Sequence, residues 1–280
     1  MTLAALLSDA APRLTSAERR VADVVLADPQ LVAFGTVAQV AEQSGTSGPS
    51  VVRCAVKLGF SGFAAMQAAA QAEIADALRP AAARIRERPA PDVVANALAF
   101  DIENVRATLE GIDALSFNAA VRLLADRQRR VFVLTSELAR GAGVALVTQL
   151  DLLREGIVAV SGSPVRSARQ LADVKRGDVV VAIDHRRYER WLLDARDVAV
   201  AAGAIVIALA DRPHAPVAVG ARHTFVVSAR GVGPFDSQVG TLALVQALNA
   251  GVAARLQRSA TSRLDAIERS WIAAGELLDG

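Results

Sequence analysis

The chain has 280 residues and carries 31 lysines and arginines against 29 aspartates and glutamates, a net charge of +2. Apolar residues make up 52% and aromatic residues 4%, so the chain can build substantial cores from alanine, valine and leucine. These values exclude an intrinsically disordered or a polybasic protein. The single cysteine, Cys54, excludes an intramolecular disulfide and a multi-cysteine metal site. At about 100–200 residues per domain, two domains are expected.

No targeting or membrane segment is recognisable in the sequence. Met1–Ala11 lacks a basic region, and Asp9 interrupts its apolar run. The longest apolar stretch, Val198–Ala210, is too short to cross a bilayer. We therefore expect no membrane partner and a cytoplasmic location, which the single cysteine also fits.

The first 80 residues show helical spacing and no convincing strand. A helix capped by Thr15 or Ser16 is expected to end near Ala27, with Glu18 completing a capping box. Further helices are expected at Pro29–Phe34, Val37–Ser44, Gly48–Leu58 and Phe63–Ala77.

Thr36–Gly59, with the sequence TVAQVAEQSGTSGPSVVRCAVKLG, has the spacing of a helix-turn-helix. Ala41 is small where the second helix would cross the first. Gly45 suits a turn that needs a positive φ. Ser47 is expected to cap the second helix, which carries an apolar stripe of Val51, Cys54 and Leu58 to seat it.

The remaining face of the second helix is small and polar, and it is the predicted DNA-binding surface. Arg53 is expected to bind a guanine bidentately. The helix N-terminus suits a phosphate, and Lys57 is expected to contact a backbone phosphate. The alternative is an ordinary helical hairpin, since the first 80 residues hold six basic and seven acidic side chains. The predicted surface comprises Ser47, Gly48, Pro49, Ser50, Val52, Arg53 and Lys57.

Residues 14–67 resemble the N-terminal domain of the RpiR family of bacterial transcriptional regulators. The ERR-VAD helix, the DP break, the AEQSG turn, the Arg53 position and the KLGFSGF ending all match. The chain departs at Gly48-Pro49, because such proteins place proline directly after the capping serine; proline at the second helical position remains acceptable. The resemblance implies double-stranded operator DNA as a partner and two subunits on a pseudo-palindromic site.

Residues 130–230 alternate short valine- and isoleucine-rich runs with helical stretches, which indicates βαβ units and a parallel sheet. Strands are expected at Arg130–Thr135, Ile157–Val160, Asp178–Ile183, Ala204–Leu209 and Thr224–Ser228. Helices are expected at Val93–Gly111, Ser116–Asp126, Arg140–Arg154, Ser167–Val174, Glu189–Ala202, Asp236–Leu256 and Ser262–Leu278.

We therefore predict an all-α helix-turn-helix domain at residues 1–78 and a linker at residues 79–100. The linker contains Pro80, Pro89 and Pro91. Residues 101–280 are expected to form an α/β domain with a flavodoxin-like, five-stranded parallel sheet, helices on both faces and a C-terminal helix.

RpiR-like proteins join the DNA-binding domain to a sugar isomerase (SIS) domain that binds phosphorylated sugars. Residues 128–256 resemble this domain, most clearly in GDVVVAID, AAGAIVIALAD and FDSQVGTLALVQAL. A doubly wound sheet places its ligand crevice at the carboxyl ends of the first and third strands. The candidate ligand-binding residues there are Thr135, Ser136, Glu137, Asp184, His185, Arg186, Arg187 and Tyr188.

Two loops depart from the pattern of phosphosugar-binding SIS domains. TSELAR replaces a glycine- and serine-rich turn, and DHRRYE replaces a serine-rich loop. Glu137 near a helix N-terminus would repel a phosphate, whereas Arg186 and Arg187 would attract phosphate or carboxylate. In the alternative interpretation, Asp184 pairs with one of these arginines and closes the crevice.

The sequence contains no hydrolase elbow, no nucleotide-binding glycine loop and no zinc-ligand spacing, so we expect no catalytic residues, cofactor or metal. The predicted function is a transcriptional regulator whose SIS domain senses a phosphorylated sugar or a related small anionic metabolite. One alternative is a constitutive dimeric regulator whose SIS domain only dimerises. A remote one is a SIS-type sugar phosphate isomerase. We expect a homodimer, with a tetramer built through the C-terminal helix left open.

Overall fold

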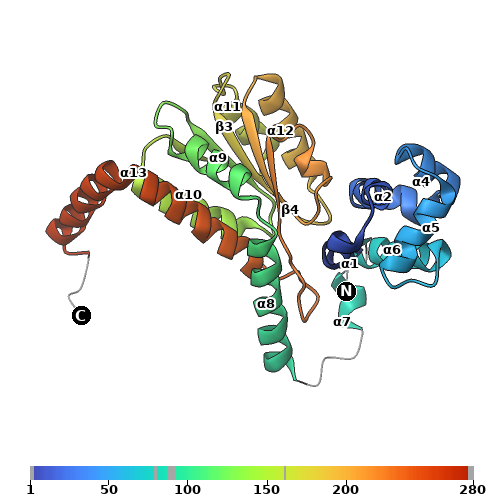
Figure 1. Cartoon of the computed structure of the whole chain (residues 1–280). Coiled ribbons are helices and arrows are strands. Elements are labelled where there is room, and N and C mark those ends of the chain that lie inside the picture. The colour runs from blue at the N-terminus through green and yellow to red at the C-terminus, as the bar shows by residue number, and fades with distance from the viewer. Residues whose placement is uncertain (1–2, 79–80, 87–91, 161, 277–280) are drawn as a thin grey trace. The chain divides into compact units, whose positions relative to one another are not determined.

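The computed structural model describes residues 3–78, 81–86, 92–160 and 162–276. The chain divides into two compact units, Met1–Arg84 and Ile85–Gly280. The first is helical and the second is built on a parallel sheet (Figure 1). Pro80, Pro89 and Pro91 of the predicted linker lie outside the described residues.

The first unit contains the helices expected from the sequence, and side-chain caps fix the N-terminal ends of α2, α3 and α4. Thr15 and Glu18 form the predicted capping box on α2, Asp28 caps α3, and Thr36 caps α4. The elements are α1 (Leu3–Ala10), the 3-10 helix η1 (Ala11–Arg13), α2 (Ser16–Ala27), α3 (Pro29–Phe34), α4 (Val37–Gln43), α5 (Gly48–Lys57), α6 (Phe63–Leu78) and α7 (Ala81–Ile85), which ends at the unit boundary.

Helix α1 was not among the elements predicted from the sequence. Leu3, Leu7 and Ala10 are buried in the core of the first unit. These positions lie on one side of a helix, at spacings of four and three residues. The short apolar N-terminal segment is therefore part of the helical core.

Helices α4 and α5 form the predicted helix-turn-helix. Gly45 has a φ of 59° in the turn between them, which is a conformation that glycine adopts without strain. Val51, Cys54 and Leu58 are buried as predicted. Arg20 of α2 secures the turn, because its guanidinium donates to the main-chain carbonyls of Ser44 and Gly45, at 3.2 and 3.4 Å.

The second unit contains a five-stranded parallel sheet with the order β2-β1-β3-β4-β5. The strands are β1 (Val131–Thr135), β2 (Ile157–Val160), β3 (Val179–Ile183), β4 (Ile205–Ala210) and β5 (His223–Val226). The helices are α8 (Val93–Glu110), α9 (Ala114–Ala125), α10 (Arg140–Leu153), α11 (Pro164–Leu171), α12 (Arg190–Ala201), the 3-10 helix η2 (Pro216–Ala218) and α13 (Val239–Ala274).

Helices cover both faces of the sheet, as predicted (Figure 1). Alternate residues of a strand point to opposite faces. Val131 and Val133 of β1 pack with α9, α10 and α13, whereas Phe132 and Leu134 pack with α11 and α12. The switch in strand order lies between β1 and β3, because β2 is on one side of β1 and the later strands are on the other.

The C-terminal region forms one helix of 36 residues, α13, instead of the two helices predicted at Asp236–Leu256 and Ser262–Leu278. Residues 257–261 contain no proline or glycine, so nothing interrupts the helical hydrogen bonds. The later part of α13 extends beyond the sheet (Figure 1). Leu278 lies outside the described residues.

Among the described helices, α13 is long and apolar enough to cross a membrane by length and composition alone. Such a helix is weak evidence of a span, because core helices pass the same test. Leu244, Leu248 and Val252 are buried against the sheet, which is the packing of a core helix.

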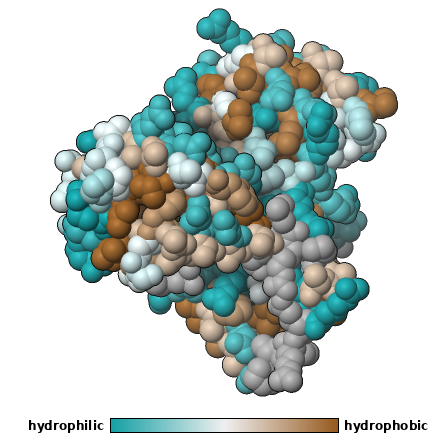
Figure 2. Space-filling model, turned by 90° about the vertical axis from the view of Figure 1, so that its right-hand side faces the viewer, coloured by the Kyte–Doolittle hydropathy of each residue, from teal (hydrophilic) through white to brown (hydrophobic). Residues whose placement is uncertain are grey.

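Apolar side chains also reach the surface. Figure 2 shows hydrophobic residues interspersed with hydrophilic ones on the face turned to the viewer. The exposed large apolar residues include Phe34, Val94, Leu98, Leu115 and Val165. Apolar atoms make up much of any protein surface, so an isolated exposed residue such as Phe34 needs no separate explanation.

Candidate functional site

The predicted DNA-binding surface lies on α5 and on the residue before it. Ser47, Pro49 and Val52 are exposed, Gly48 is partly exposed, and the Arg53 side chain is 61% exposed. The expectation that Ser50 faces outward is wrong, because Ser50 is buried. Ser50 lies one turn before Cys54, so the helical period places it on the side of α5 that faces the core.

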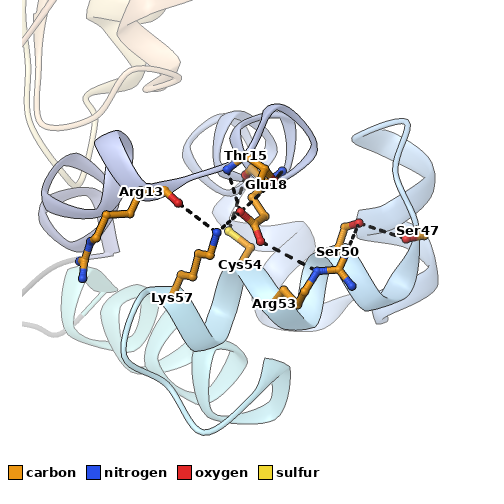
Figure 3. A network of polar contacts seen from close by, with 8 residues as sticks. All are labelled: Arg13, Thr15, Glu18, Ser47, Ser50, Arg53, Cys54 and Lys57. Atoms are coloured by element: carbon orange, nitrogen blue, oxygen red, sulfur yellow. Dashed lines mark hydrogen bonds and ion pairs between the residues drawn. The ribbon is translucent and has the colours of Figure 1, made fainter.

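Ser47 does not cap α5 as predicted, since its side chain makes no hydrogen bond to the helix backbone. Its Oγ lies 3.0 Å from the Ser50 Oγ. The Arg53 guanidinium in turn donates to the Ser50 Oγ at 3.0 Å (Figure 3). This chain of polar contacts orients Arg53 along α5 while leaving most of its side chain in solvent.

Glu18 of α2 is the centre of a buried polar network (Figure 3). Its capping box with Thr15 was predicted, but its contacts with Lys57 and Arg53 of α5 were not. Its carboxylate accepts from the Thr15 N–H and hydroxyl, both at 2.8 Å, and from the Lys57 Nζ at 2.7 Å. The Arg53 Nε lies 4.0 Å away. The hydrogen bond from Lys57, followed by that from the Thr15 main chain, lowers the pKa of Glu18 to about 2.

Lys57 is engaged inside the first unit. Besides the Glu18 carboxylate, its Nζ donates to the main-chain carbonyl of Arg13 at 3.0 Å. The ammonium thus ties α5 to α2 and to the turn before it. Cys54 is buried beside this network, and burial raises the pKa of its thiol to about 11, which keeps it in the unreactive form.

In the second unit, a cleft of about 360 Å³ opens beside the carboxyl ends of β1 and β2 and the start of α10. Of the residues predicted to bind a ligand, Thr135 and Glu137 line it. Gly143 allows α10 to approach β1, because a Cβ there would lie 2.1 Å from the Thr135 Cγ2. The lining residues are Val133, Thr135, Glu137, Arg140, Gly143, Val144, Val147, Thr148, Ala159, Val160, Gly162, Glu189 and Trp191.

Glu189 is a cleft residue that was not predicted, and it connects the loops after β1 and β3. Its Oε1 accepts from the Glu137 N–H at 2.6 Å, and its Oε2 accepts from the Trp191 indole N–H. The Glu137 carboxylate pairs with Arg140. Glu189 is the last residue of the DHRRYE loop and directly follows the candidate residue Tyr188, but its contact with Glu137 spans 52 positions of sequence.

Asp184 and His185 are buried beneath the loops and do not line the cleft. The Asp184 carboxylate accepts from the main-chain N–H groups of His185 and Glu189, at 2.8 and 2.9 Å, and it is hydrogen-bonded to Ser136. Burial is the main cause that raises the pKa of Asp184 to about 6. The His185 ring Nε2 lies 3.2 Å from the Thr241 Oγ1, and burial lowers the His185 pKa.

The two predicted arginines behave differently from each other. Arg186 forms an ion pair with Asp236, with its Nε 2.7 Å from the Oδ2, so the alternative in which it pairs with Asp184 is wrong. Arg187 is exposed and has a φ of 70°. Tyr188 is turned away from the cleft lining and donates its hydroxyl to Asp211; burial raises the pKa of that hydroxyl.

Among the described residues, no group of three or more histidine, cysteine, aspartate or glutamate side chains could hold a metal ion. Each unit offers one candidate functional site. One is an exposed helix face with an oriented arginine. The other is a cleft whose charged residues are Glu137, Arg140 and Glu189.

Two family models match the chain. A helix-turn-helix domain of the rpiR family matches residues 1–77, and the SIS domain matches residues 123–250. The HTH-type transcriptional regulator HexR of Pseudomonas aeruginosa is 29% identical over 202 residues, covering 70% of this chain and 68% of HexR. The bifunctional protein glk of Paraburkholderia xenovorans is 27% identical over 198 residues, covering 70% of this chain but 31% of that protein.

Solved structures share the fold. The sugar isomerase domain of an RpiR transcription factor from Sphaerobacter thermophilus is 29% identical, with a TM-score of 0.58, and covers 63% of this chain and 98% of that one. The Vibrio vulnificus NanR protein complexed with ManNAc-6P is 18% identical, with a TM-score of 0.58, and covers 98% of this chain and 99% of that one. With its helix-turn-helix and SIS domains, the chain belongs to the rpiR family of transcriptional regulators.

Proposed function

We propose that this transcriptional regulator binds operator DNA through α5 and senses a phosphorylated sugar in the cleft of its SIS domain. The observation that carries the sensing role is the cleft of about 360 Å³ at the carboxyl edge of the sheet. Ligands of doubly wound sheets bind at this edge. NanR, which has the same fold, holds ManNAc-6P, and this supports the choice of a sugar phosphate.

The proposed DNA contact places the start of α5 in the major groove. Arg53 is its main base-reading residue, because its guanidinium is exposed and already oriented by Ser50. Ser47, Gly48 and Pro49 would approach the DNA backbone at the helix N-terminus. Val52 would meet an apolar base edge such as the thymine methyl group.

The proposal includes no catalysis, cofactor or metal. A SIS-type isomerase needs a base positioned beside the sugar. His185 is buried against Thr241 outside the cleft lining. The carboxylates that line the cleft are held by Arg140 and by the Glu137 N–H and Trp191 indole. A role limited to sensing fits these contacts better than proton transfer does.

A second candidate function is constitutive DNA binding with a SIS domain that only dimerises. The observation that favours it is the presence of the Glu137 and Glu189 carboxylates in the cleft, since both oppose the entry of an anion. The two candidates differ in one measurable property, which is whether a sugar phosphate binds the protein at all.

The proposed assembly is a cytoplasmic homodimer. The exposed stripe of α8 supports it, because this helix presents apolar side chains to solvent although it packs on α13 with its other side. A two-fold dimer matches a pseudo-palindromic operator. The exposed residues of this stripe are Val94, Leu98, Ile102 and Leu109.

Fluorescence anisotropy tests this function on DNA from upstream of the protein's own gene. The wild type is expected to bind this DNA more tightly than random DNA. Arg53→Ala is expected to weaken specific binding roughly 5- to 150-fold, equivalent to about 1–3 kcal/mol. Arg53→Lys keeps the charge but loses the planar fork, so it should lose specificity with little change in salt dependence.

The same assay screens hexose and pentose phosphates for a shift in operator affinity. A shift with one of them would support sensing, because an effector acts only by binding two states of the protein differently. A flat screen together with tight operator binding would favour the constitutive regulator. Equal and weak binding to all DNA would contradict the role given to α5.

A further inference from the structure

We propose that the Glu189 carboxylate occupies the anion-binding position of the SIS cleft and thereby determines which ligands enter it. A phosphorylated ligand would have to displace this carboxylate from the Glu137 N–H. The inference rests on the proposed function, because it concerns the same cleft and the same class of ligand.

The contacts of Glu189 are those of a bound anion. Main-chain N–H groups before a helix attract anions. The N–H of Glu137, just before α10, points at the Glu189 Oε1 at 2.6 Å. The other carboxylate oxygen accepts from the Trp191 indole N–H. Both oxygens therefore have donors, and the position that would receive a phosphate oxygen is filled by the protein itself.

Helix α12 does not require this side chain. Glu189 is the N-cap residue of α12, yet its side chain makes no capping hydrogen bond to the main chain of the helix. The Glu189 main chain is held separately, because its N–H donates to the buried Asp184 carboxylate at 2.9 Å. The side chain is therefore able to leave the Glu137 N–H while α12 stays in place.

The charges that line the cleft determine whether Glu189 favours or opposes the binding of a phosphate. Its charged lining residues are Glu137, Glu189 and Arg140, and Arg140 is already paired with Glu137. A phosphate monoester carries about −1.5 to −2 at neutral pH. Glu189 thus opposes a phosphate in two ways: its negative charge repels the phosphate, and its carboxylate already accepts the hydrogen bonds from the Glu137 N–H and the Trp191 indole. An uncharged sugar meets no such repulsion.

Two variants of the full-length protein test the inference. Glu189→Gln removes the charge at constant size, and Glu189→Ser removes the carboxylate while supplying a preferred N-cap residue. Asp194→Asn is the matched control, because it makes the same charge change on α12 at a residue that is 65% exposed, pairs with Arg190 and does not line the cleft. Calorimetry would measure binding of glucose 6-phosphate, inorganic phosphate and glucose.

Both Glu189 variants are expected to bind glucose 6-phosphate about tenfold more tightly than the wild type, or better, because a charged competitor for the same donors is gone. Inorganic phosphate should also bind more tightly to both Glu189 variants than to the wild type. Binding of glucose should not change, and Asp194→Asn should behave as the wild type. Tighter binding of glucose 6-phosphate by the Glu189 variants, and not by Asp194→Asn, would support the inference. If the wild type did not bind glucose 6-phosphate at all, the inference would still stand, but the proposed sensing function would be contradicted.

Three results would overturn the inference. Binding of glucose 6-phosphate by the wild type with equal or lower affinity in the Glu189 variants would contradict it and leave the sensing function standing. An equal gain in affinity for glucose 6-phosphate in Asp194→Asn would show that the net charge of the protein, and not the position of Glu189, causes the tighter binding. A lack of binding in the wild type and in both variants would contradict the inference and the sensing function together.

Discussion

At the scale of single residues, a small number of buried polar contacts fix the positions of the charged residues on α5. Glu18 is 2% exposed, and it holds Lys57 and lies beside Arg53. A buried carboxylate is tolerated only when donors compensate for its lost hydration, and here the Thr15 main chain and hydroxyl supply them together with Lys57. Arg53, which we propose to read a base, is thus presented from a helix that is anchored by its neighbours.

Lys57→Gln is predicted to lower the free energy of unfolding by about 1–2 kcal/mol, because the buried Glu18 carboxylate loses a charged donor. The loss is smaller than for a fully buried ion pair because Lys57 is 36% exposed and solvent screens its charge. Urea unfolding would measure it, with Lys175→Gln, an exposed lysine of the second unit, as the control. The salt dependence of operator binding should stay the same; a decrease of its slope by about one would assign Lys57 a phosphate contact instead.

Glu18→Gln is predicted to change the pH dependence of stability. The folded-state pKa of Glu18 is about 2, below the ordinary value of 4.5. The ionised carboxylate therefore contributes stability that is fully present above pH 4.5 and is lost as the pH falls toward 2. The wild type should be more stable than Glu18→Gln near neutral pH, and this difference should shrink at about pH 3.

Hydrogen exchange of peptides from residues 16–58, followed across this pH range in urea, would report on the first unit alone. Glu42→Gln is the matched control, because Glu42 is exposed on α4. A stability difference between wild type and Glu18→Gln that is the same at all pH values would contradict the assignment of the effect to ionisation.

At the scale of elements, close approaches between helices depend on glycine. Gly251 lies inside α13, where a Cβ would meet the Val121 Cγ2 of α9 at 2.8 Å. Glycine lowers the stability of a helix interior, so its presence here indicates that α9 and α13 must pack closely. Gly143 has the same role between α10 and Thr135 at the cleft.

Gly251→Val is predicted to destabilise the second unit by about 1–3 kcal/mol, because Val121 is buried and branched and has no room to move. Gly141→Ala on α10 is the control, since a Cβ there meets nothing within 4 Å, and it should leave stability unchanged or raise it by up to about 1 kcal/mol. Thermal unfolding would measure both. A neutral Gly251→Val would show that α13 shifts away from α9 at little cost.

At the scale of the whole molecule, the two units divide the work of a regulator. The first unit carries α5, the helix proposed to contact DNA, and the second holds the cleft and the exposed stripe of α8. Coupling between an effector and DNA requires a ligand that distinguishes two arrangements of the protein. A coupling of about 1–3 kcal/mol would suffice for a switch.

The protein is predicted to be a dimer in solution, with a mass of twice 29.2 kDa. Leu98→Glu combined with Ile102→Glu on α8 should shift it toward the monomer, because these side chains are 63% and 50% exposed and charges there would oppose apolar contact. Light scattering after gel filtration would measure the mass. Val165→Glu on the exposed start of α11 is the control, and a dimer that survives the α8 substitutions would place the interface elsewhere.

Most of the fold followed from the sequence because its signals are local. The capping residues Thr15, Asp28 and Thr36 and the turn at Gly45 each act within a few residues of the helix end they define. The valine-rich runs of the sheet alternate with helices, and parallel pairing follows from that alternation. The same kind of signal identified the helix-turn-helix. The crevice was predicted at the carboxyl ends of β1 and β3, but the cleft opens beside β1 and β2, and no residue of β3 lines it.

By itself, the sequence determined a helical part with a helix-turn-helix followed by a part built on a five-stranded parallel sheet, and the exposed position of Arg53. Only the tertiary structure decided which partners the charged residues have. Lys57 pairs with Glu18, Arg186 pairs with Asp236, and Glu189 accepts from the Glu137 N–H. Each contact joins residues 39 to 52 positions apart, so it exists only after separate elements have packed, and no local pattern of residues encodes it.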